Sequence, residues 1–476
     1  MRLVLGAGFA AILERHLEAA TPADLLAWAL TALPRHDPRL AVLQRGREVE
    51  LRLGGATLLT RDVAETDGMT PARAGGAAGD ALTVFHAAAW DVSPPLRSTG
   101  APRLIGESFE AVFSHLDPFS RYITPAEAQS ARERRTGEAG LGLRLALRRG
   151  AGAAVAAVSA DGPAAEAGLR VGDRIIAIDG LPLRTRDAGT AARLLEGPAG
   201  SKVVMLVQRG RERIEVRLMR RLPVGTPVEA QRIGDVLLLR IQGFSARTER
   251  EVMAALQSAL SQEDRPAALL IDLRGNRGGL LHQAAAVADI FLSDGEAFRT
   301  MGRHPDSRRI YVTGRTDRAE GLPIVVLVDG RTASSAELLA ASLSDRGRAA
   351  VAGTGTMGKG LVQLVVPLPD GGELLMSWSR LILPRGWPLQ GVGVLPGLCT
   401  AGGPEAAAAA LAALRAGARP MGPAQARQQA LRLPVAPAAI EALRAACPAG
   451  DPREEDVTLA RALALDPVAL AAALPR

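Results

Sequence analysis

The segment between residues 235 and 344 constrains the fold most, because short apolar strands alternate there with helical patterns. The expected pairs are 236–241 with 248–262, 267–273 with 280–292, and 323–328 with 335–344. Alternation of this kind is typical of a mostly parallel sheet that is covered by helices. We therefore predict an α/β core in this part of the chain.

The chain before residue 137 has a different character. Residues 8–45 and 107–116 have helical patterns, residues 49–63 alternate like a short hairpin, and residues 65–82 are Gly/Ala-rich and loop-like. Residues 1–13 fit an amphipathic first helix better than an export signal, because no small-residue cleavage site precedes Glu14.

From residue 137 the pattern becomes β-rich. Strands are expected at 141–147, 153–158, 174–178, 202–208 and 213–219, with helical pieces at 163–168 and 187–196. Further along, strands are expected at 361–368 and 374–383, and Ala-rich helices at 404–416, 422–432, 437–446 and 453–463. We therefore divide the chain into four expected regions. They are a mainly helical cap region (1–136), a compact β module (137–221), the α/β core (222–400) and a helical tail (401–476).

The composition excludes several classes of protein. The net charge of +7 would suit a nucleic-acid partner, but aromatic residues make up only 3% and leave few surfaces on which bases could stack. The arginines are also spread along the chain. No apolar run approaches the ~18–20 residues that a membrane-spanning helix needs. We expect no nucleic-acid partner.

Lysine is rare in this chain. Of its 57 basic residues only Lys202 and Lys359 are lysines, and Lys202 stands at the entry to an expected strand. Arginine keeps its proton in proteins, whereas a desolvated lysine can lose it. Lys359 is therefore a candidate for chemistry that arginine cannot perform.

The two cysteines, Cys399 and Cys447, form no CxxC motif, so neither a metal site nor a disulfide-dense scaffold is expected. A single bridge between them would fit an oxidising compartment, and the sequence leaves this pairing open.

Two strand-to-helix turns could stabilise negative charge. Residues 270–279 lead from a buried strand through Gly278 and Gly279 into a helix, where backbone amides could face a ligand. Residues 328–337 make a similar turn at Ser334. Ser334-x-x-Glu337 is also a capping box, so helix capping alone could account for this serine.

A third segment, residues 353–360, nearly matches the phosphate-binding loop. Two features oppose nucleotide binding. Gly360 stands where the magnesium-binding Ser or Thr should be, and the following residues have a strand pattern with prolines instead of a helix start.

The three segments fit better as one serine hydrolase site. No histidine lies in a recognisable triad motif and there is no G-x-S-x-G sequence. If Ser334 is the nucleophile, Lys359 is the candidate base, provided that an apolar site keeps its amine neutral. Gln363 would lie on the same side of a strand as Lys359, and its amide oxygen could orient the amine.

These residues resemble the carboxy-terminal processing proteases, which are PDZ-containing serine–lysine peptidases of family S41. The family's S-A-S-A-S-E motif is similar to Thr332–Glu337 and places the nucleophile at Ser334. Its G-K-G-x-V-Q motif matches Gly358–Gln363, with the base at Lys359 and its partner at Gln363.

Four further motifs of the family occur in the same order, within residues 107–400. They are D-P-x-S-x-Y at Asp117–Tyr122, D-L-R-x-N-x-G-G at Asp272–Gly279, P-L-P-D-G at Pro367–Gly371 and G-x-G-x-x-P at Gly391–Pro396. Each motif is weak alone, whereas together they are highly specific.

The resemblance implies an α+β multidomain protein with a crotonase-like protease core sheet, an inserted PDZ-like β domain and flanking helical segments. It implies a serine endopeptidase that cleaves proteins near their C-terminus, without metal or other cofactor. We expect the backbone amide of Ser335, with that of Gly278 or Gly279, to form the oxyanion hole.

The β module resembles a PDZ domain. Gly140, Leu141, Gly142 and Leu143 match the loop that holds a peptide carboxylate, and residues 167–180 match a second characteristic segment. The implied partners are protein or peptide substrates with accessible apolar C-termini, whose peptide would add a strand to the sheet.

The chain departs from the family pattern at three positions. Ser335 beside Ser334 provides a second serine, Thr354 stands where an acidic residue is common, and Gly397 replaces a frequent Asp. The resemblance implies work in the cell envelope or periplasm, although the sequence carries no clear export signal.

Two other readings of the chain stay open. One is a PDZ-type scaffold with an inactive protease fold, against which the intact Ser334, Lys359 and Gln363 argue. The other is a serine–lysine amidase or transpeptidase, which the missing S-x-x-K motif opposes. An adaptor protein, a homo-oligomer and membrane association are left open by the sequence.

Overall fold

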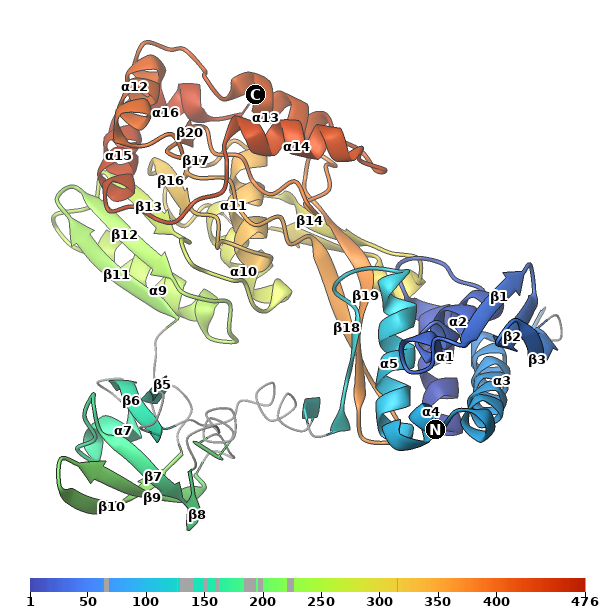
Figure 1. The fold of residues 1–476 in the computed structure, drawn as a ribbon. Helices are drawn as coiled ribbons and strands as arrows, with labels where there is room; N and C mark the ends of the chain where they lie inside the picture. Colours follow the sequence, from blue (N-terminus) through green and yellow to red (C-terminus); the bar gives the residue numbers. More distant parts are fainter. Residues whose placement is uncertain are drawn as a thin grey trace.

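The computed structural model describes most of the chain (Figure 1). The described residues are 1–63, 68–125, 127–128, 141, 143–148, 152–158, 162–183, 194–195, 200–220, 227–314 and 316–475. Helices and several separate sheets make up these parts, so the fold is the mixed, multidomain α+β architecture that the sequence predicts. No helix within the described ranges is long and apolar enough to cross a membrane.

The core sheet has the order β11-β12-β13-β16-β17-β20, and all neighbours except β11 and β12 are parallel. Its strands are β11 (Val228–Ile233), β12 (Val236–Ile241), β13 (Ala268–Asp272), β16 (Ile324–Val328), β17 (Ala350–Gly353) and β20 (Leu398–Cys399). The expected parallel sheet is therefore confirmed, with an antiparallel strand added at one edge.

Helices cover both faces of this sheet. One face packs against α9 (Thr248–Leu260), α10 (Leu281–Phe291) and α11 (Ser335–Asp345). The other packs against α12 (Pro404–Arg415), α15 (Glu455–Ala464) and α16 (Pro467–Ala473). The strand period of two explains this, because Leu239 and Leu238 of β12 enter opposite hydrophobic clusters. Helices α12, α15 and α16 therefore form one layer of the core.

A second sheet has the order β15-β14-β19-β18, with β4 also paired to β19. Its strands are β4 (Arg121–Ile123), β14 (Gly295–Met301), β15 (Arg309–Thr313), β18 (Leu361–Pro367) and β19 (Glu373–Ile382). Figure 1 shows β18 and β19 running from the core toward α5. Along this hairpin, Leu364, Leu374 and Met376 pack into the N-terminal hydrophobic cluster.

The N-terminal region combines helices with a small antiparallel sheet. The elements are α1 (Arg2–Arg15), α2 (Pro22–Leu30), the short 3-10 helix η1 (Leu33–Arg35), β1 (Leu40–Arg45), β2 (Glu48–Leu53), β3 (Ala56–Asp62), α3 (Pro71–Val92), α4 (Pro94–Thr99) and α5 (Ala101–Ser114). The hairpin expected at 49–63 is confirmed. The helical expectation is wrong for 40–45, which pair as strand β1 with β2 and bury Leu40.

The loop expected at 65–82 is also wrong for residues 71–82, which form the first half of α3. The glycines there serve close helix packing: a Cβ on Gly79 would lie 2.5 Å from the Gly6 nitrogen, and one on Gly75 would lie 2.2 Å from the Ala10 nitrogen. Low helix propensity is overridden because glycine lets α1 and α3 approach closely.

The PDZ-like module is an antiparallel sheet of order β10-β9-β7-β6-β5, with β8 paired to β7. Its elements are β5 (Leu143–Arg148), β6 (Gly152–Val158), α7 (Pro163–Glu166), β7 (Arg174–Ile178), β8 (Leu181–Pro182), β9 (Lys202–Arg209) and β10 (Glu212–Met219). The expected strands are confirmed. Of the helix expected at 187–196, only residues 194–195 are among the described residues.

Helices α13 (Gly422–Ala430) and α14 (Pro437–Ala446) complete the C-terminal region, and a second 3-10 helix, η3 (Pro305–Ser307), joins β14 to β15. Cys399 at the end of β20 and Cys447 at the end of α14 form a disulfide. The pairing that the sequence left open is therefore present, and it ties α14 to the core sheet.

We expect Gly79→Ala to destabilise the N-terminal region by ~1–3 kcal/mol, because the added methyl group would overlap the backbone of α1. Gly76→Ala is the matched control on the same helix, since nothing lies within 4 Å of a Cβ there. That change should be neutral or stabilise by about 0.5–1 kcal/mol. Urea unfolding of both variants tests this expectation, and equal stability of the two would contradict the packing argument.

Candidate active site

Ser334 stands at the sharp turn between β16 and α11. Its backbone dihedrals are φ 57° and ψ −120°, a conformation that non-glycine residues rarely adopt. Strain of this kind costs ~1–3 kcal/mol and persists only where neighbouring contacts enforce it. The chain lacks the G-x-S-x-G sequence, yet it places a half-buried serine on the same type of strained strand-to-helix turn.

The turn that follows β13 helps to enforce this conformation. The Ala333 amide donates to the Asn276 carbonyl at 2.9 Å, and Thr332 Oγ1 donates to the Leu273 carbonyl at 2.9 Å. A Cβ on Gly278 would lie 2.9 Å from the Ser334 Cβ, so only glycine fits beside the serine. The two strand-to-helix turns singled out in the sequence are therefore in direct contact.

The three backbone amides expected to form the oxyanion hole differ in their hydrogen bonding. The Gly278 amide donates to Asn276 Oδ1 at 2.8 Å and is therefore engaged. Among the residues that the structure describes, the amides of Gly279 and Ser335 have no hydrogen-bond partner. Of the two glycines, Gly279 thus keeps a free donor beside Ser335.

The two adjacent serines are also distinguished by their contacts. Ser335 is fully buried, and its Oγ donates to the Gly279 carbonyl at 2.9 Å. Ser334 is partly exposed. The hydroxyl of Ser335 is therefore committed to structure, which leaves Ser334 as the accessible serine.

Glu337 joins the turn at Ser334 to residues 353–360, which we call the lysine loop. Its Oε2 accepts hydrogen bonds from the Ser334 amide at 2.8 Å and the Lys359 amide at 2.9 Å. Its Oε1 accepts from the Gly358 amide at 2.7 Å and from Thr356 Oγ1. Two nitrogens that share one acceptor at such distances lie within about 6 Å of each other. The backbones of Ser334 and Lys359 are therefore held side by side.

The Glu337 side chain is completely buried. Burial raises the pKa of Glu337, and the hydrogen bonds from Thr356 and the three amides oppose this rise. All four recorded partners are donors, which suits an acceptor-only carboxylate. Glu337 thus bonds the amide at the start of the helix, as the S-x-x-E pattern predicts. It also bonds the lysine loop, which the pattern does not indicate.

Lys359 lies between two glycines that permit close backbone contact. A Cβ on Gly360 would lie 2.2 Å from the Gln390 nitrogen, and one on Gly358 would lie 3.0 Å from the Gly391 carbonyl carbon. The loop continues directly into β18, so no helix follows to bind a phosphate group. The strand expected after residues 353–360 is therefore confirmed, and the Lys359 side chain is half-buried.

Gln363 occupies an irregular position in the β18–β19 hairpin. The register shifts between Val362 and Gln363, and Gln363 lies opposite Ser377. Such bulges redirect side chains and are frequent next to active sites. The Gln363 amide nitrogen donates to the Phe119 carbonyl at 2.7 Å, which leaves its oxygen as the free end of the amide.

Within the described residues, no hydrogen bond joins the side chains of Ser334, Lys359 and Gln363 to one another. Catalytic hydrogen bonds are often long in substrate-free enzymes and tighten in the complex. Glu337 therefore holds the backbones of Ser334 and Lys359 side by side, and Gln363 lies further along β18. No cluster of metal-ligating side chains occurs in the part of the chain that the structure describes.

The C-terminal region packs directly against the lysine loop. Thr354 Oγ1 donates to the Gly450 carbonyl at 3.2 Å, and the Gly450 amide donates back to Thr354 Oγ1 at 3.1 Å. The Gly355 amide donates to Pro448 at 3.3 Å, and the Gly330 amide donates to Gly450 at 2.8 Å. We call residues 448–450 the C-terminal strap.

This packing accounts for two departures from the family motifs. Thr354 bonds the C-terminal strap where an acidic residue is common. A Cβ on Gly397 would lie 2.1 Å from the Ala473 carbonyl oxygen, so α16 excludes an aspartate there.

The expected carboxylate loop of the PDZ-like module is described only in part. Leu141 is buried and its carbonyl accepts from the Ala164 amide at 2.9 Å, while Leu143 begins β5. Gly140 and Gly142 lie outside the described residues.

Two family models match this chain. The model for peptidase family S41 covers residues 235–398, and the model for the PDZ domain covers residues 154–209. The first contains Ser334, Lys359 and Gln363, and the second lies within the antiparallel β module.

Several known proteins are similar to this chain. A carboxy-terminal-processing protease of Bartonella bacilliformis is 32% identical over 299 residues, which cover 62% of this chain and 69% of that protein. A carboxyl-terminal-processing protease of Synechocystis is 33% identical over 301 residues, which cover 61% of this chain and 69% of that protein. Among solved structures, the photosystem II D1 C-terminal processing protease is 28% identical with a TM-score of 0.40, covering 61% of this chain and 81% of that one.

The alignment with these relatives, together with a strained serine and a lysine loop held by one carboxylate, shows that the chain belongs to the carboxy-terminal-processing serine proteases of peptidase family S41.

Proposed function

We propose that the protein cleaves protein substrates near their C-terminus with Ser334 as nucleophile, Lys359 as general base and Gln363 as the residue that orients the lysine. The single observation that carries this proposal is the Glu337 carboxylate, which holds the backbones of Ser334 and Lys359 together. Membership of the serine peptidase family supplies the reaction class.

In the first half of the reaction, the Lys359 amine takes the hydroxyl proton while Ser334 Oγ bonds to the substrate carbonyl carbon. The carbonyl oxygen becomes an oxyanion, which the amides of Ser335 and Gly279 would stabilise. Lys359 then gives the proton to the leaving nitrogen, the peptide bond breaks and an acyl-enzyme remains.

In the second half, water attacks the acyl-enzyme while Lys359 accepts one of its protons. The ester bond to Ser334 Oγ breaks, and the proton returns from Lys359 to that oxygen. The products are two peptides, and the enzyme regains its initial protonation state. Each donor of an oxyanion hole contributes ~3–4 kcal/mol in other hydrolases.

We further propose that the PDZ-like module captures the substrate's C-terminus. The antiparallel sheet and the match of residues 154–209 to the PDZ model support this role. A peptide would extend the sheet at an edge strand, and its carboxylate would bind the amides around Gly140–Leu143.

A compartment outside the cytoplasm is the location we propose for this enzyme. The Cys399–Cys447 disulfide supports it, because such bonds persist in oxidising compartments. Related proteins come from bacteria, and one of Arabidopsis thaliana is named as chloroplastic.

Cleavage of an unfolded reporter with an apolar C-terminus tests the serine–lysine assignment. Ser334→Ala and Lys359→Arg should each lower kcat by at least ~10³-fold. The first substitution removes the nucleophile, and the second replaces the base by an arginine, which keeps its proton. Ser335→Ala is the matched control and should keep most activity, since its hydroxyl only bonds the Gly279 carbonyl. Full activity of folded Lys359→Arg would remove the general-base assignment. If the folded wild type neither cuts nor reacts with a serine-directed probe, the inactive-scaffold alternative is favoured.

Glu337→Gln should lower kcat by about 10²-fold, because an amide cannot accept all four hydrogen bonds and the two backbones would separate. Asp345→Asn is the control, since Asp345 is a buried carboxyl group on the same helix that accepts from Trp387 at 2.8 Å, away from the serine turn. Steady-state cleavage and thermal unfolding of both variants separate catalysis from stability. Equal kcat values for the two would contradict the role of Glu337.

Gly142→Asp should weaken capture of C-terminal peptides by charge repulsion with the peptide carboxylate. Fluorescence anisotropy of a labelled apolar peptide measures the affinity, and the same peptide with an amidated C-terminus is the control. Unchanged affinity of the variant for the free carboxylate would count against this binding loop.

A further inference from the structure

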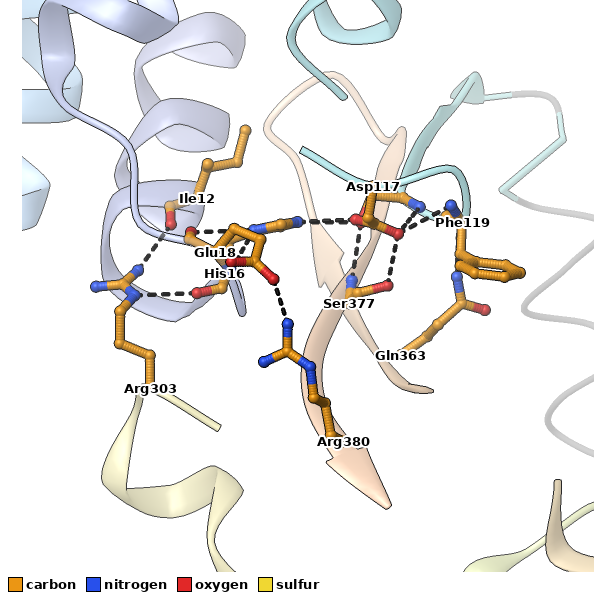
Figure 2. Close-up of polar contacts among 10 residues, drawn as sticks. Ile12, His16, Glu18, Asp117, Phe119, Arg303, Gln363, Ser377 and Arg380 are labelled. Atoms are coloured by element: carbon orange, nitrogen blue, oxygen red, sulfur yellow. Dashed lines mark hydrogen bonds and ion pairs between the residues drawn. The ribbon is translucent and has the colours of Figure 1, made fainter. Parts of the chain in front are cut away.

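Asp117 is the centre of a buried polar cluster that joins the N-terminal region to the β18–β19 hairpin (Figure 2). Its Oδ2 accepts from His16 Nε2 at 2.9 Å and from Ser120 Oγ at 2.5 Å. Its Oδ1 accepts from Ser377 Oγ at 2.9 Å and from the Phe119 amide at 2.8 Å. We call Asp117, His16, Ser120 and Ser377 the Asp117 cluster.

The charge state of Asp117 fits this arrangement. Burial alone would raise the pKa of its carboxyl group, but the hydrogen bonds from His16, Ser120, the Phe119 amide and Ser377 outweigh burial and hold the pKa well below its usual range. An ionised carboxylate can accept all of these bonds at once. Asp117 is therefore a fixed acceptor around which the donors are ordered.

His16 brings the first helix into the cluster. It is fully buried at the end of α1, and its Nε2 donates to the Asp117 carboxylate at 2.9 Å, while its Nδ1 lies 3.0 Å from the Glu18 amide nitrogen and 3.1 Å from the Glu18 carbonyl oxygen. Arg303 donates to the His16 carbonyl at 3.1 Å and to the Leu13 carbonyl at 2.6 Å. The C-terminal end of α1 is therefore anchored both to the cluster and to the protease core.

Ser377 connects the cluster to the hairpin. Its amide donates to Ser120 Oγ at 2.9 Å, its hydroxyl donates to Asp117, and its carbonyl accepts from the Leu17 amide at 2.9 Å. All of its polar groups are thus engaged, and Ser377 is the residue opposite Gln363 at the register shift. The β19 side of the bulge, at Ser377, is therefore held by the Asp117 cluster.

The β18 side of the bulge, at Gln363, is held by the loop of residues 117–122. The Phe119 carbonyl accepts the Gln363 amide nitrogen at 2.7 Å, and the Phe119 amide donates to Asp117. Because a carbonyl oxygen can only accept, this contact fixes which end of the Gln363 amide points away from the loop. Figure 2 shows Gln363 beside Phe119, on the strand next to the one that carries Ser377.

The far end of the loop is held as well. Tyr122 Oη donates to Asp370 Oδ2 at 2.8 Å, at the tip of the same hairpin. The segment 117–122 is therefore bonded to the hairpin at Ser377, at Gln363 and at Asp370. A loop fixed at three points can transmit a displacement of Asp117 to the Gln363 side chain.

We propose that Asp117, His16 and Ser377 are positioning residues that set the orientation of Gln363 and, through it, the alignment of Lys359 with Ser334. This inference rests on the proposed function. Under it, the first helix of the chain takes part in catalysis without touching the substrate.

The test compares two serines on β19. Ser377→Ala removes a hydroxyl that bonds Asp117, whereas Ser379→Ala removes an equally buried hydroxyl that has no hydrogen-bond partner among the described residues. We expect Ser377→Ala to lower kcat by about tenfold with little change in KM, because misalignment affects the reaction more than binding. Ser379→Ala should leave both parameters near those of the wild type.

A double-mutant cycle then shows whether the effect passes through Gln363. Ser377→Ala should lower kcat in the wild-type background but have little further effect in Gln363→Ala, since residues that act through one another are not additive. The rate of labelling by a serine-directed phosphonate should follow the same pattern, because it reports Ser334 activation without peptide binding.

Asp117→Asn extends the test with its own control. Asp37→Asn alters a buried carboxylate elsewhere in the N-terminal region, one that accepts from Ser93 Oγ at 2.8 Å. We expect Asp117→Asn to lower kcat more than tenfold and Asp37→Asn to affect stability alone.

Two results would overturn the inference: a Ser377→Ala effect of equal size in the Gln363→Ala background, or full activity of Gln363→Ala. Neither result would touch the serine–lysine assignment, which fails only if Ser334→Ala or Lys359→Arg remains active. The two failures are therefore distinguishable.

Discussion

A single buried carboxylate organises the catalytic region. Glu337 accepts hydrogen bonds from the backbone of Ser334 and from the backbone of Lys359, which are far apart in the chain. A buried glutamate is costly unless its oxygens are satisfied, and here four donors satisfy them. Moving either segment would leave part of this carboxylate without a partner, so the energetic penalty of an unpaired buried charge keeps the two loops in register. The strained backbone of Ser334 is tolerated for the same reason.

The β18–β19 hairpin connects the region around Lys359 to the N-terminal helices. It begins next to the lysine loop, passes through the irregular pairing at Gln363 and ends in the hydrophobic cluster of the N-terminal helices. The same hairpin therefore carries Gln363 and also forms part of the core of the N-terminal region. Packing of the helices and alignment of the site are coupled through one pair of strands.

The sequence predicted the parallel sheet, the PDZ-like strands and the motifs around Ser334 and Lys359, because their signals are local. The Gly/Ala-rich sequence predicts a loop at 65–82 because glycine disfavours helices, and only contact with α1 explains the helix observed over residues 71–82. His16 carried no signal, since a lone histidine in a first helix has no local partner and meets Asp117 only in the folded chain. The hydrogen bond between Thr354 and Gly450 could not be predicted from the sequence either, because no sequence pattern relates their two segments.

The C-terminal strap has a consequence for the order in which the site forms during synthesis of the chain. During synthesis the chain leaves the ribosome from its N-terminus, so Ser334, Lys359 and Gln363 all emerge well before Pro448 and Gly450. Until those residues arrive, Thr354, Gly355 and Gly330 lack the partners that brace the lysine loop, and Cys399 has no cysteine to join. A chain that stops before Pro448 would therefore carry Ser334, Lys359 and Gln363 without the contacts that brace the lysine loop.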